Sequence, residues 1–107
     1  MQKVYAYCRV SGKSQLIGNG FDRQIECIRN FCHQSGHKII QVFEEQVSGI
    51  KSENDRPIFK SMISSILGRN VDTIIIESLD RLAREHRIQG SLLIYLASKN
   101  MVLLQFS

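Results

Sequence analysis

Ser11 follows a strand-like run of residues and lies two positions after an arginine. In residues 4–10, small apolar side chains alternate with Tyr5, Tyr7 and Arg9. This period of two is typical of a β-strand, and it places Arg9 and Ser11 on the same side of the strand. An arginine and a hydroxyl at one strand end, without a paired histidine, indicate phosphate chemistry with Ser11 as the nucleophile.

A second charged group follows another apolar segment. Residues 71–76 are nearly all apolar and β-branched, as expected for a buried strand, and Asp80, Arg81 and Arg84 come soon after them. Guanidiniums suit phosphoryl transfer, because their planar forks donate two hydrogen bonds to the charged oxygens of the transition state. The sequence therefore predicts a phosphate site built by arginines from two strand ends.

The group that removes the proton of Ser11 has several candidates. Asp80 or Glu45 could act as the general base, or the arginines could lower the pKa of the hydroxyl enough for water to serve. Asp80 also has a structural interpretation, in which it caps the following helix or pairs with Arg84 four residues later. Sequence does not choose between these roles.

Other nucleophile and phosphate motifs fit the sequence less well. Residues 12–14 resemble the end of a nucleotide-binding P-loop, but the glycine that this motif requires at position 7 is Tyr7. Cys8 would need an arginine six residues later to act as a phosphatase nucleophile, and Ser14 occupies that position. A Ser-His-Asp hydrolase is also disfavoured, because the histidines fall at predicted helix positions and no elbow glycine precedes the serine.

Two cysteines and two histidines lie close together between residues 27 and 37, but their spacing matches no zinc finger. Cys32 falls on the apolar face of a predicted helix and is therefore expected in the core. The chain has three cysteines in all, an odd number that suits reduced thiols in a reducing compartment. We expect no metal site.

Strand-like and helix-like segments alternate along the whole chain. We expect strands at 4–10, 38–44, 71–76 and 101–106, and helices at 22–34, 56–67 and 82–99. The expected helix starts and stops are Asp22, Asp55 with Pro57, Gly36 and Gly68. This alternation predicts an α/β fold, a three-layer open sheet that is mostly parallel, and for this sheet we expect the strand order 2-1-3-4.

The predicted topology brings the polar residues to one edge. In open parallel sheets, ligands bind beyond the carboxyl ends of the strands, where the strand order reverses. Ser11 would then face Arg81 and Arg84 across the crevice between the first and third strands. The residues expected to leave the second strand at the same edge are Glu45, Ser48 and Arg56.

Length and composition fit one soluble domain. The chain has 107 residues, 43% of them hydrophobic, and a formal charge of +4, which leans toward a polyanionic partner without establishing one. No apolar run approaches the roughly 20 residues that span a bilayer, and no secretory signal is apparent. We therefore expect a cytoplasmic protein.

Two motifs resemble those of a known family. The first is residues 7–11 (YCRVS) and the second is residues 79–84 (LDRLAR), and residues 43–49 and 55–56 extend the match. Together they resemble the catalytic domain of the serine recombinases, the resolvase and invertase family, over essentially the whole chain. The resemblance implies a site-specific recombinase that cleaves and rejoins DNA strands, with no cofactor and no metal.

By this resemblance, Ser11 attacks a DNA phosphodiester to form a 5′-phosphoserine link and a free 3′-hydroxyl. The strands are then exchanged and resealed by the reverse reaction. The residues implied to surround the phosphate are Arg9, Arg81 and Arg84, and those implied to support them are Arg56, Asp80 and Gln24.

The resemblance also implies partners and a setting. Double-stranded DNA would be the substrate, and the complete protein would be a homo-oligomer, dimer or tetramer, in the cytoplasm of a bacterial, phage or mobile-element system. The family's oligomerisation helix and DNA-binding domain would lie beyond Ser107, so residues 1–107 are expected to be the catalytic domain and not competent alone.

The alternative hypothesis is a catalytically inactive, recombinase-like binding or regulatory module. A pure scaffold has no chemical need for the set Arg9, Ser11, Arg81 and Arg84, which argues against it.

Overall fold

The first strand, β1 (Gln2–Val10), contributes side chains to two separate cores, one on each side of the sheet. Tyr5 and Tyr7 belong to one core, whereas Val4, Ala6 and Cys8 belong to the other. The period of two in the sequence is therefore confirmed. The computed structural model that shows this describes residues 2–12, 20–66 and 71–106.

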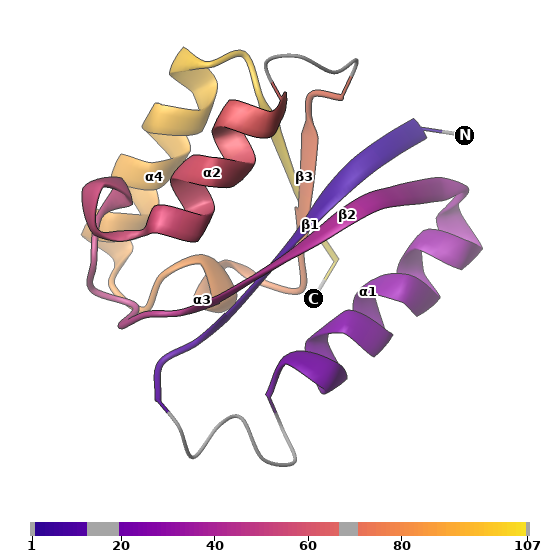
Figure 1. Cartoon of the computed structure of the whole chain (residues 1–107), viewed down its shortest axis with the longest axis horizontal. Coiled ribbons are helices and arrows are strands. Elements are labelled where there is room, and N and C mark those ends of the chain that lie inside the picture. Colours follow the sequence, from indigo (N-terminus) through magenta and orange to yellow (C-terminus); the bar gives the residue numbers. More distant parts are fainter. Residues whose placement is uncertain (1, 13–19, 67–70, 107) are drawn as a thin grey trace.

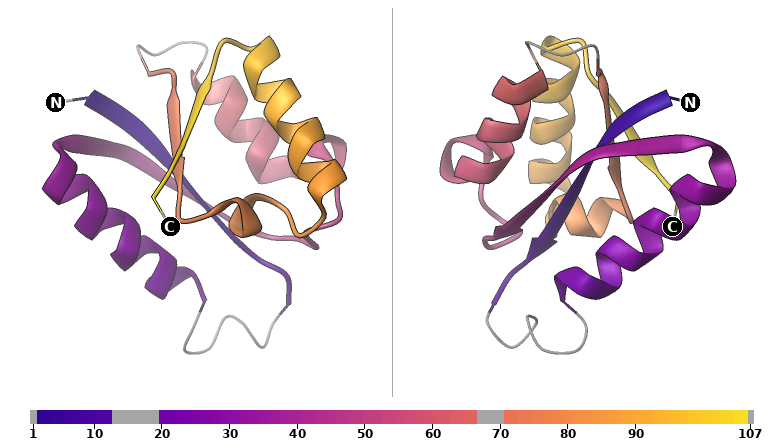
Figure 2. Two further views of the ribbon diagram at one scale, coloured as in Figure 1. Left: turned by 180° about the vertical axis from the view of Figure 1, so that it is seen from behind. Right: turned by 45° about the vertical axis from the view of Figure 1, so that its right-hand side comes forward.

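Four strands form one sheet in the order β2-β1-β3-β4, and every paired strand is parallel to its neighbour. The three strands that join β1 are β2 (His37–Gln46), β3 (Thr73–Ile76) and β4 (Val102–Gln105). Helix α1 (Phe21–Ser35) covers one face, and α2 (Pro57–Ile66) and α4 (His86–Ser98) cover the other (Figures 1 and 2). The predicted three-layer α/β fold and strand order are confirmed.

Helix α1 ends where the sequence predicts. Gly36 adopts a left-handed conformation with φ of 77°, and its N–H donates to the carbonyl of Cys32. Glycine suits this position because it has no Cβ to clash. The predicted cap at Asp22 is wrong: the helix begins at Phe21 after Gly20, and Asp22 lies within the first turn.

The start of α2 differs from the prediction. Pro57 is its first residue, as expected, but Asp55 is not the cap and belongs to a short 3-10 helix, η2 (Glu53–Asp55). The N–H groups of the first turn of α2 instead donate to Glu45 of β2. The predicted end of this helix, at Leu67 and Gly68, lies outside the described residues.

The helix predicted at 82–99 is present but begins later, because α4 covers His86–Ser98 and a separate short helix precedes it. A short helix, α3 (Leu79–Leu82), ends at Ala83, whose backbone is extended with φ of −158° and ψ of 152°. Tertiary partners replace helical hydrogen bonds here: the carbonyl of Ala83 accepts from Gln89, and the N–H of Arg84 donates to the carbonyl of Gly49. These contacts satisfy the backbone groups that a continuous helix would have paired.

The helices are short for a membrane span. The longest of those described, α1, has 15 residues, whereas a span needs about 20. Within the described ranges, no helix is long and apolar enough to cross a membrane.

Candidate active site

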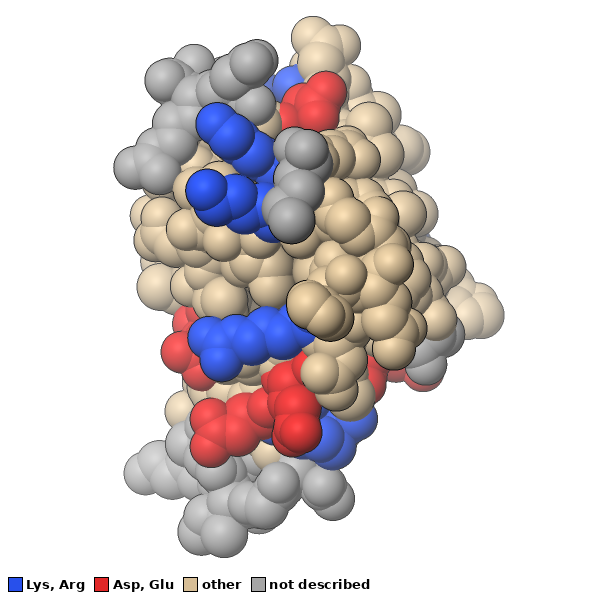
Figure 3. All heavy atoms as spheres, turned by 90° about the vertical axis from the view of Figure 1, so that its right-hand side faces the viewer, with Lys and Arg blue, Asp and Glu red and all other residues tan. Residues whose placement is uncertain are grey.

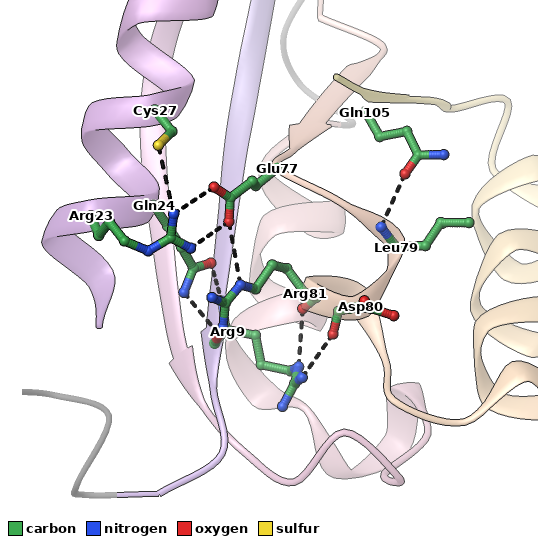
Figure 4. A network of polar contacts seen from close by, with 9 residues as sticks. All are labelled: Arg9, Arg23, Gln24, Cys27, Glu77, Leu79, Asp80, Arg81 and Gln105. Carbon is green, nitrogen blue, oxygen red and sulfur yellow. Dashed lines mark hydrogen bonds and ion pairs between the residues drawn. The ribbon is translucent and has the colours of Figure 1, made fainter. Parts of the chain in front are cut away.

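Arg9, the penultimate residue of β1, is held by hydrogen bonds from every nitrogen of its guanidinium. Its Nε donates to the carbonyl of Arg81 at 3.0 Å, and its Nη2 donates to the carbonyl of Asp80 at 2.9 Å (Figure 4). Its Nη1 donates to the carbonyl of Val47 at 3.0 Å and to Oγ of Ser11 at 2.7 Å. Only 3% of this arginine is exposed, so its position is fixed before any ligand binds.

The environment of Arg9 concentrates positive charge. Burial lowers the pKa of its guanidinium to about 10, and the nearby charges of Arg56, Arg84 and Arg81 act in the same direction. Arg9 still carries its proton at neutral pH and remains a donor. A phosphate placed here would offset the repulsion among the four guanidiniums.

Ser11 lies just beyond the end of β1 and is partly exposed. Its Oγ accepts the hydrogen bond from Nη1 of Arg9, so the prediction that the two side chains share one side of the strand is confirmed. A cationic donor stabilises the developing charge of an attacking oxygen. The pair thus places the hydroxyl predicted as the nucleophile beside a cationic hydrogen-bond donor.

Gln24 of α1 holds the backbone of Arg9 from the side. Its Oε1 accepts from the N–H of Arg9 at 3.3 Å, and its Nε2 donates to the carbonyl of Arg9 at 3.0 Å. Gln24 is fully buried. Gln24, which the resemblance implies as a site residue, therefore lies against the strand end that carries Arg9.

Arg56 lies beneath the site and is fully buried. Its Nε donates to the carbonyl of Lys51 at 3.0 Å, and its Nη1 donates to the carbonyl of Leu82 and to the hydroxyl of Tyr7. Its Nη2 is buried with no partner in the described structure. Arg56 thus ties three segments together below the surface, which suits the supporting role implied by the resemblance.

Glu45 caps α2 instead of leaving β2 toward the site. Its Oε2 accepts from the N–H of Ile58 at 2.8 Å, and its Oε1 accepts from the N–H of Phe59 at 3.0 Å and the hydroxyl of Tyr7 at 2.8 Å. Burial raises the pKa of Tyr7, so its hydroxyl keeps the proton that it donates. Glu45 is 3% exposed, and both of its oxygens are committed to structural partners.

The residues of the second motif extend from α3. Asp80 lies in the first turn and is exposed, whereas Ser78 occupies the cap position. No ion pair joins Asp80 to Arg84 in the described part of the chain. The structural interpretation of Asp80, as a cap or as the partner of Arg84, is therefore wrong.

Arg84 is exposed, and a close backbone contact sets its position. A Cβ added to Gly49 would lie 2.8 Å from the backbone nitrogen of Arg84. Only glycine allows the loop after β2 to approach this closely. The loop also supplies, through Val47, one of the carbonyls that hold Arg9.

Sequence reasoning missed the carboxylate of Glu77, which directly follows β3. It accepts two hydrogen bonds from Arg23 of α1, at 2.8 and 2.7 Å, and one from Nε of Arg81 at 3.4 Å (Figure 4). The hydrogen bonds from Arg23 hold the pKa of this carboxyl below its usual range. The sequence signal that could have identified Glu77 is its position directly after a buried strand.

Two of the cysteines, Cys8 and Cys32, lie in the core between α1 and the sheet. Cys8 is buried on the α1 side of the sheet, and burial raises its pKa to about 12, so it remains a thiol at neutral pH. Cys32 is 3% exposed, which confirms its predicted place in the core. Among the residues that the structure describes, no three His, Cys, Asp or Glu side chains form a group that could hold a metal ion.

Charge is mixed on the side of the molecule that lies to the right in Figure 1. Figure 3 shows basic and acidic side chains next to one another in the lower part of this side and again near its top, with uncharged surface between the two regions. The exposed residues of α1 include the acidic Asp22 and Glu26 as well as the basic Arg29. The formal charge of +4 is therefore not gathered into one basic patch on this side.

Comparisons with known sequences agree on one family. The model described as "Resolvase, N terminal domain" matches residues 4–106. Serine recombinase PinR of Escherichia coli K12 is 33% identical over 84 residues, which are 77% of this chain and 38% of that protein. The Tn2501 transposon resolvase of E. coli is 35% identical over 86 residues, 78% of this chain and 39% of that protein. The chain thus spans about two fifths of the length of these relatives.

Solved structures share the fold. The N-terminal catalytic domain of TP901-1 integrase aligns with a TM-score of 0.80 and 26% identity, over 97% of this chain and 77% of that one. The C-terminal catalytic domain of ISC1926 TnpA, an IS607-like serine recombinase, aligns with a TM-score of 0.77 and 23% identity, over 96% of this chain and 68% of that one. At that identity, the second likeness concerns the fold alone.

Proposed function

The chain belongs to the serine recombinase family, in the group defined by the resolvase N-terminal domain, and we propose that residues 1–107 are the catalytic domain of a site-specific DNA recombinase. The observation that carries this proposal is the hydrogen bond of 2.7 Å from Nη1 of Arg9 to Oγ of Ser11. This bond joins the hydroxyl of Ser11, just beyond the end of β1, to the guanidinium of Arg9. That guanidinium is already fixed in place by its other hydrogen bonds.

In the proposed reaction, Oγ of Ser11 attacks the phosphorus of a DNA phosphodiester. The new bond joins Oγ to phosphorus, and the bond from phosphorus to the 3′-oxygen breaks. The proton of Ser11 leaves to a base, and the departing 3′-oxygen gains a proton to become a hydroxyl. The product is a 5′-phosphoserine link, and the same steps in reverse reseal the strand.

The arginines stabilise the charge on the phosphate oxygens. Arg9 holds the nucleophile, while Arg81 and Arg84 approach from α3 and the segment after it. In a site that excludes water, one well-placed donor contributes roughly 3 kcal/mol to transition-state stabilisation. Burial lowers the pKa of Arg9, and the nearby charges of Arg56, Arg84 and Arg81 lower it further, so these guanidiniums lie close enough to act on one phosphate together.

We assign proton removal from Ser11 to Asp80 or to water, not to Glu45. The two oxygens of Glu45 already accept three hydrogen bonds in the core. Asp80 is exposed at the same edge, and no partner holds its carboxylate in the described part of the chain. Its backbone carbonyl also fixes Arg9, which keeps Asp80 near the nucleophile.

Double-stranded DNA is the proposed substrate, and a homo-oligomer is the proposed working form. A phosphodiester fits a site with several arginines, one serine hydroxyl and a net positive chain. Exchange of strands between two duplexes requires more than one active site, which supports a dimer or tetramer. With DNA as the substrate, the proposed location is the cytoplasm, in a bacterial, phage or mobile-element context.

The proposal is tested by trapping the covalent adduct. The full gene product that contains this chain is incubated with DNA from its host, denatured, and analysed for protein that stays attached to DNA. Ser11→Ala should abolish the adduct without lowering the midpoint of thermal unfolding. Ser64→Ala, at an exposed position of α2, is the matched control and should leave the adduct unchanged. An adduct formed by the Ser11→Ala variant would refute the assignment.

A further inference from the structure

Glu77 joins the two elements that hold Arg9 in place. Its carboxylate receives both terminal nitrogens of Arg23 in a fork, and Arg23 precedes Gln24, the residue that clamps the backbone of Arg9. The same carboxylate receives Nε of Arg81, whose carbonyl accepts from Nε of Arg9. Figure 4 shows Glu77 between α1 and α3 in this network.

The carboxylate of Glu77 is ionised and held in one orientation. The side chain of Glu77 is 11% exposed, and that of Arg23 is 34% exposed. A forked pair between guanidinium and carboxylate fixes the geometry of both planes. Because the hydrogen bonds from Arg23 lower the pKa of Glu77, the carboxylate is ionised at neutral pH.

The contact with Arg81 uses only one edge of its guanidinium. Its Nε donates to Oε1 of Glu77 at 3.4 Å, and neither Nη nitrogen has a partner among the described residues. A planar guanidinium presents its Nε edge and its terminal nitrogens in different directions. Glu77 therefore restricts the orientation of Arg81 and leaves the terminal nitrogens available to an anion.

We propose that Glu77 is a positioning residue: anchored by Arg23, it orients Arg81 so that the terminal nitrogens of Arg81 meet the phosphate attacked by Ser11. This inference rests on the function proposed above. Glu77 does not touch the substrate, and its effect passes through Arg81. Its carboxylate also offsets part of the positive charge that Arg23 and Arg81 would otherwise place side by side.

A double-mutant cycle separates this role from simple support of the fold. The rate of adduct formation is measured at saturating DNA, in single turnover, for the full gene product carrying Glu77→Gln, Arg81→Lys, or both. Glu77→Gln should slow the reaction about tenfold, within the range of coupling between contacting residues. In the Arg81→Lys background, which lacks Nε, the same change should slow it less than about twofold.

One further measurement and two further variants complete the experiment. The DNA concentration that gives half the maximal rate should stay within about twofold, because Arg81 acts on the transition state more than on the bound substrate. Glu77→Asp keeps the carboxylate and should retain more of the rate than Glu77→Gln. Glu44→Gln, which removes an exposed carboxylate of β2, is the matched control and should have no effect.

The outcomes distinguish the inference from the function on which it rests. If the unsubstituted protein forms no adduct, the proposed function fails and the inference fails with it. If the unsubstituted protein forms the adduct, but Glu77→Gln slows the reaction by the same factor with Arg81 present and with Arg81→Lys, Glu77 only supports the fold. In that case the inference alone is wrong. Equal rates for Glu77→Gln and Glu44→Gln would also overturn the inference.

Discussion

The side chain of Gln24 pairs with the backbone of Arg9 as a neighbouring strand would. It accepts from the N–H of Arg9 at 3.3 Å and donates to the carbonyl of Arg9 at 3.0 Å. Strand β3 pairs with β1 only at Tyr5 and Ala6, so it offers no partner this far along β1. A glutamine from α1 thus completes the hydrogen bonding of the strand end that carries the site.

Removal of this clamp should cost stability and activity together. Gln24→Ala leaves two buried backbone groups without partners and should lower the free energy of unfolding by about 2–3 kcal/mol. Urea unfolding measures this change. Gln41→Ala, at an exposed position of β2, is the control and should stay within about 0.5 kcal/mol of the unsubstituted chain. An equal effect of the two changes would contradict the clamp.

The cap of α2 gives a second prediction. Glu45→Ala should lower the free energy of unfolding by about 3 kcal/mol, because it removes a buried acceptor from two helix N–H groups and from Tyr7. Asp55→Ala should cost less than about 0.5 kcal/mol, since Asp55 is exposed. The reverse order, with Asp55→Ala the more damaging change, would restore Asp55 as the cap.

Local patterns were sufficient for the parallel α/β fold and for the position of the site. Alternation of strands and helices implied parallel pairing, whereas the strand order 2-1-3-4, which is observed, is not fixed by alternation alone. The period of two in β1 placed Arg9 and Ser11 on one side, and a hydrogen bond joins them. Both patterns are carried by neighbouring residues, so a single sequence is enough to read them.

Long-range capping could not be predicted in the same way. Glu45 lies 13 residues before Ile58, whose N–H donates to it, and reaches this helix only through the packing of β2. The break after α3 likewise depends on Gly49 and Gln89, which are distant along the chain or lie in the next helix. Local helix signals at 82–99 carry no trace of these partners.

Lysine substitutions test whether the arginines act through directed hydrogen bonds. Arg9→Lys keeps the charge, but one ammonium cannot reproduce bonds from Nε, Nη1 and Nη2, so adduct formation should slow by about 100-fold or more. Arg81→Lys and Arg84→Lys should also cut the rate severely. Arg87→Lys, at an exposed surface pair, is the control. Near-normal rates in all three site variants would show that these arginines contribute only a general electrostatic attraction for DNA.

Two glycines provide a matched pair for the loop contact. Gly49→Ala places a Cβ 2.7 Å from Cγ and 2.8 Å from the backbone nitrogen of Arg84, so the loop must shift, at a cost of about 1–3 kcal/mol. Gly90→Ala in α4 meets nothing within 4 Å and should stabilise the chain by about 0.5–1 kcal/mol. Thermal unfolding compares them, and a neutral Gly49→Ala would show that the approach to Arg84 is not tight.

Peptide mapping of the protein–DNA adduct tests the central claim most directly. Trypsin cuts after Arg9 and Lys13, and Ser11 carries the only side-chain hydroxyl in the peptide between them. Mass spectrometry of the digested adduct should find the nucleotide on this peptide, linked through a 5′-phosphate, with a free 3′-hydroxyl on the cleaved strand. A nucleotide attached to any other peptide, or linked through a 3′-phosphate, would contradict the assignment of Ser11 as the nucleophile.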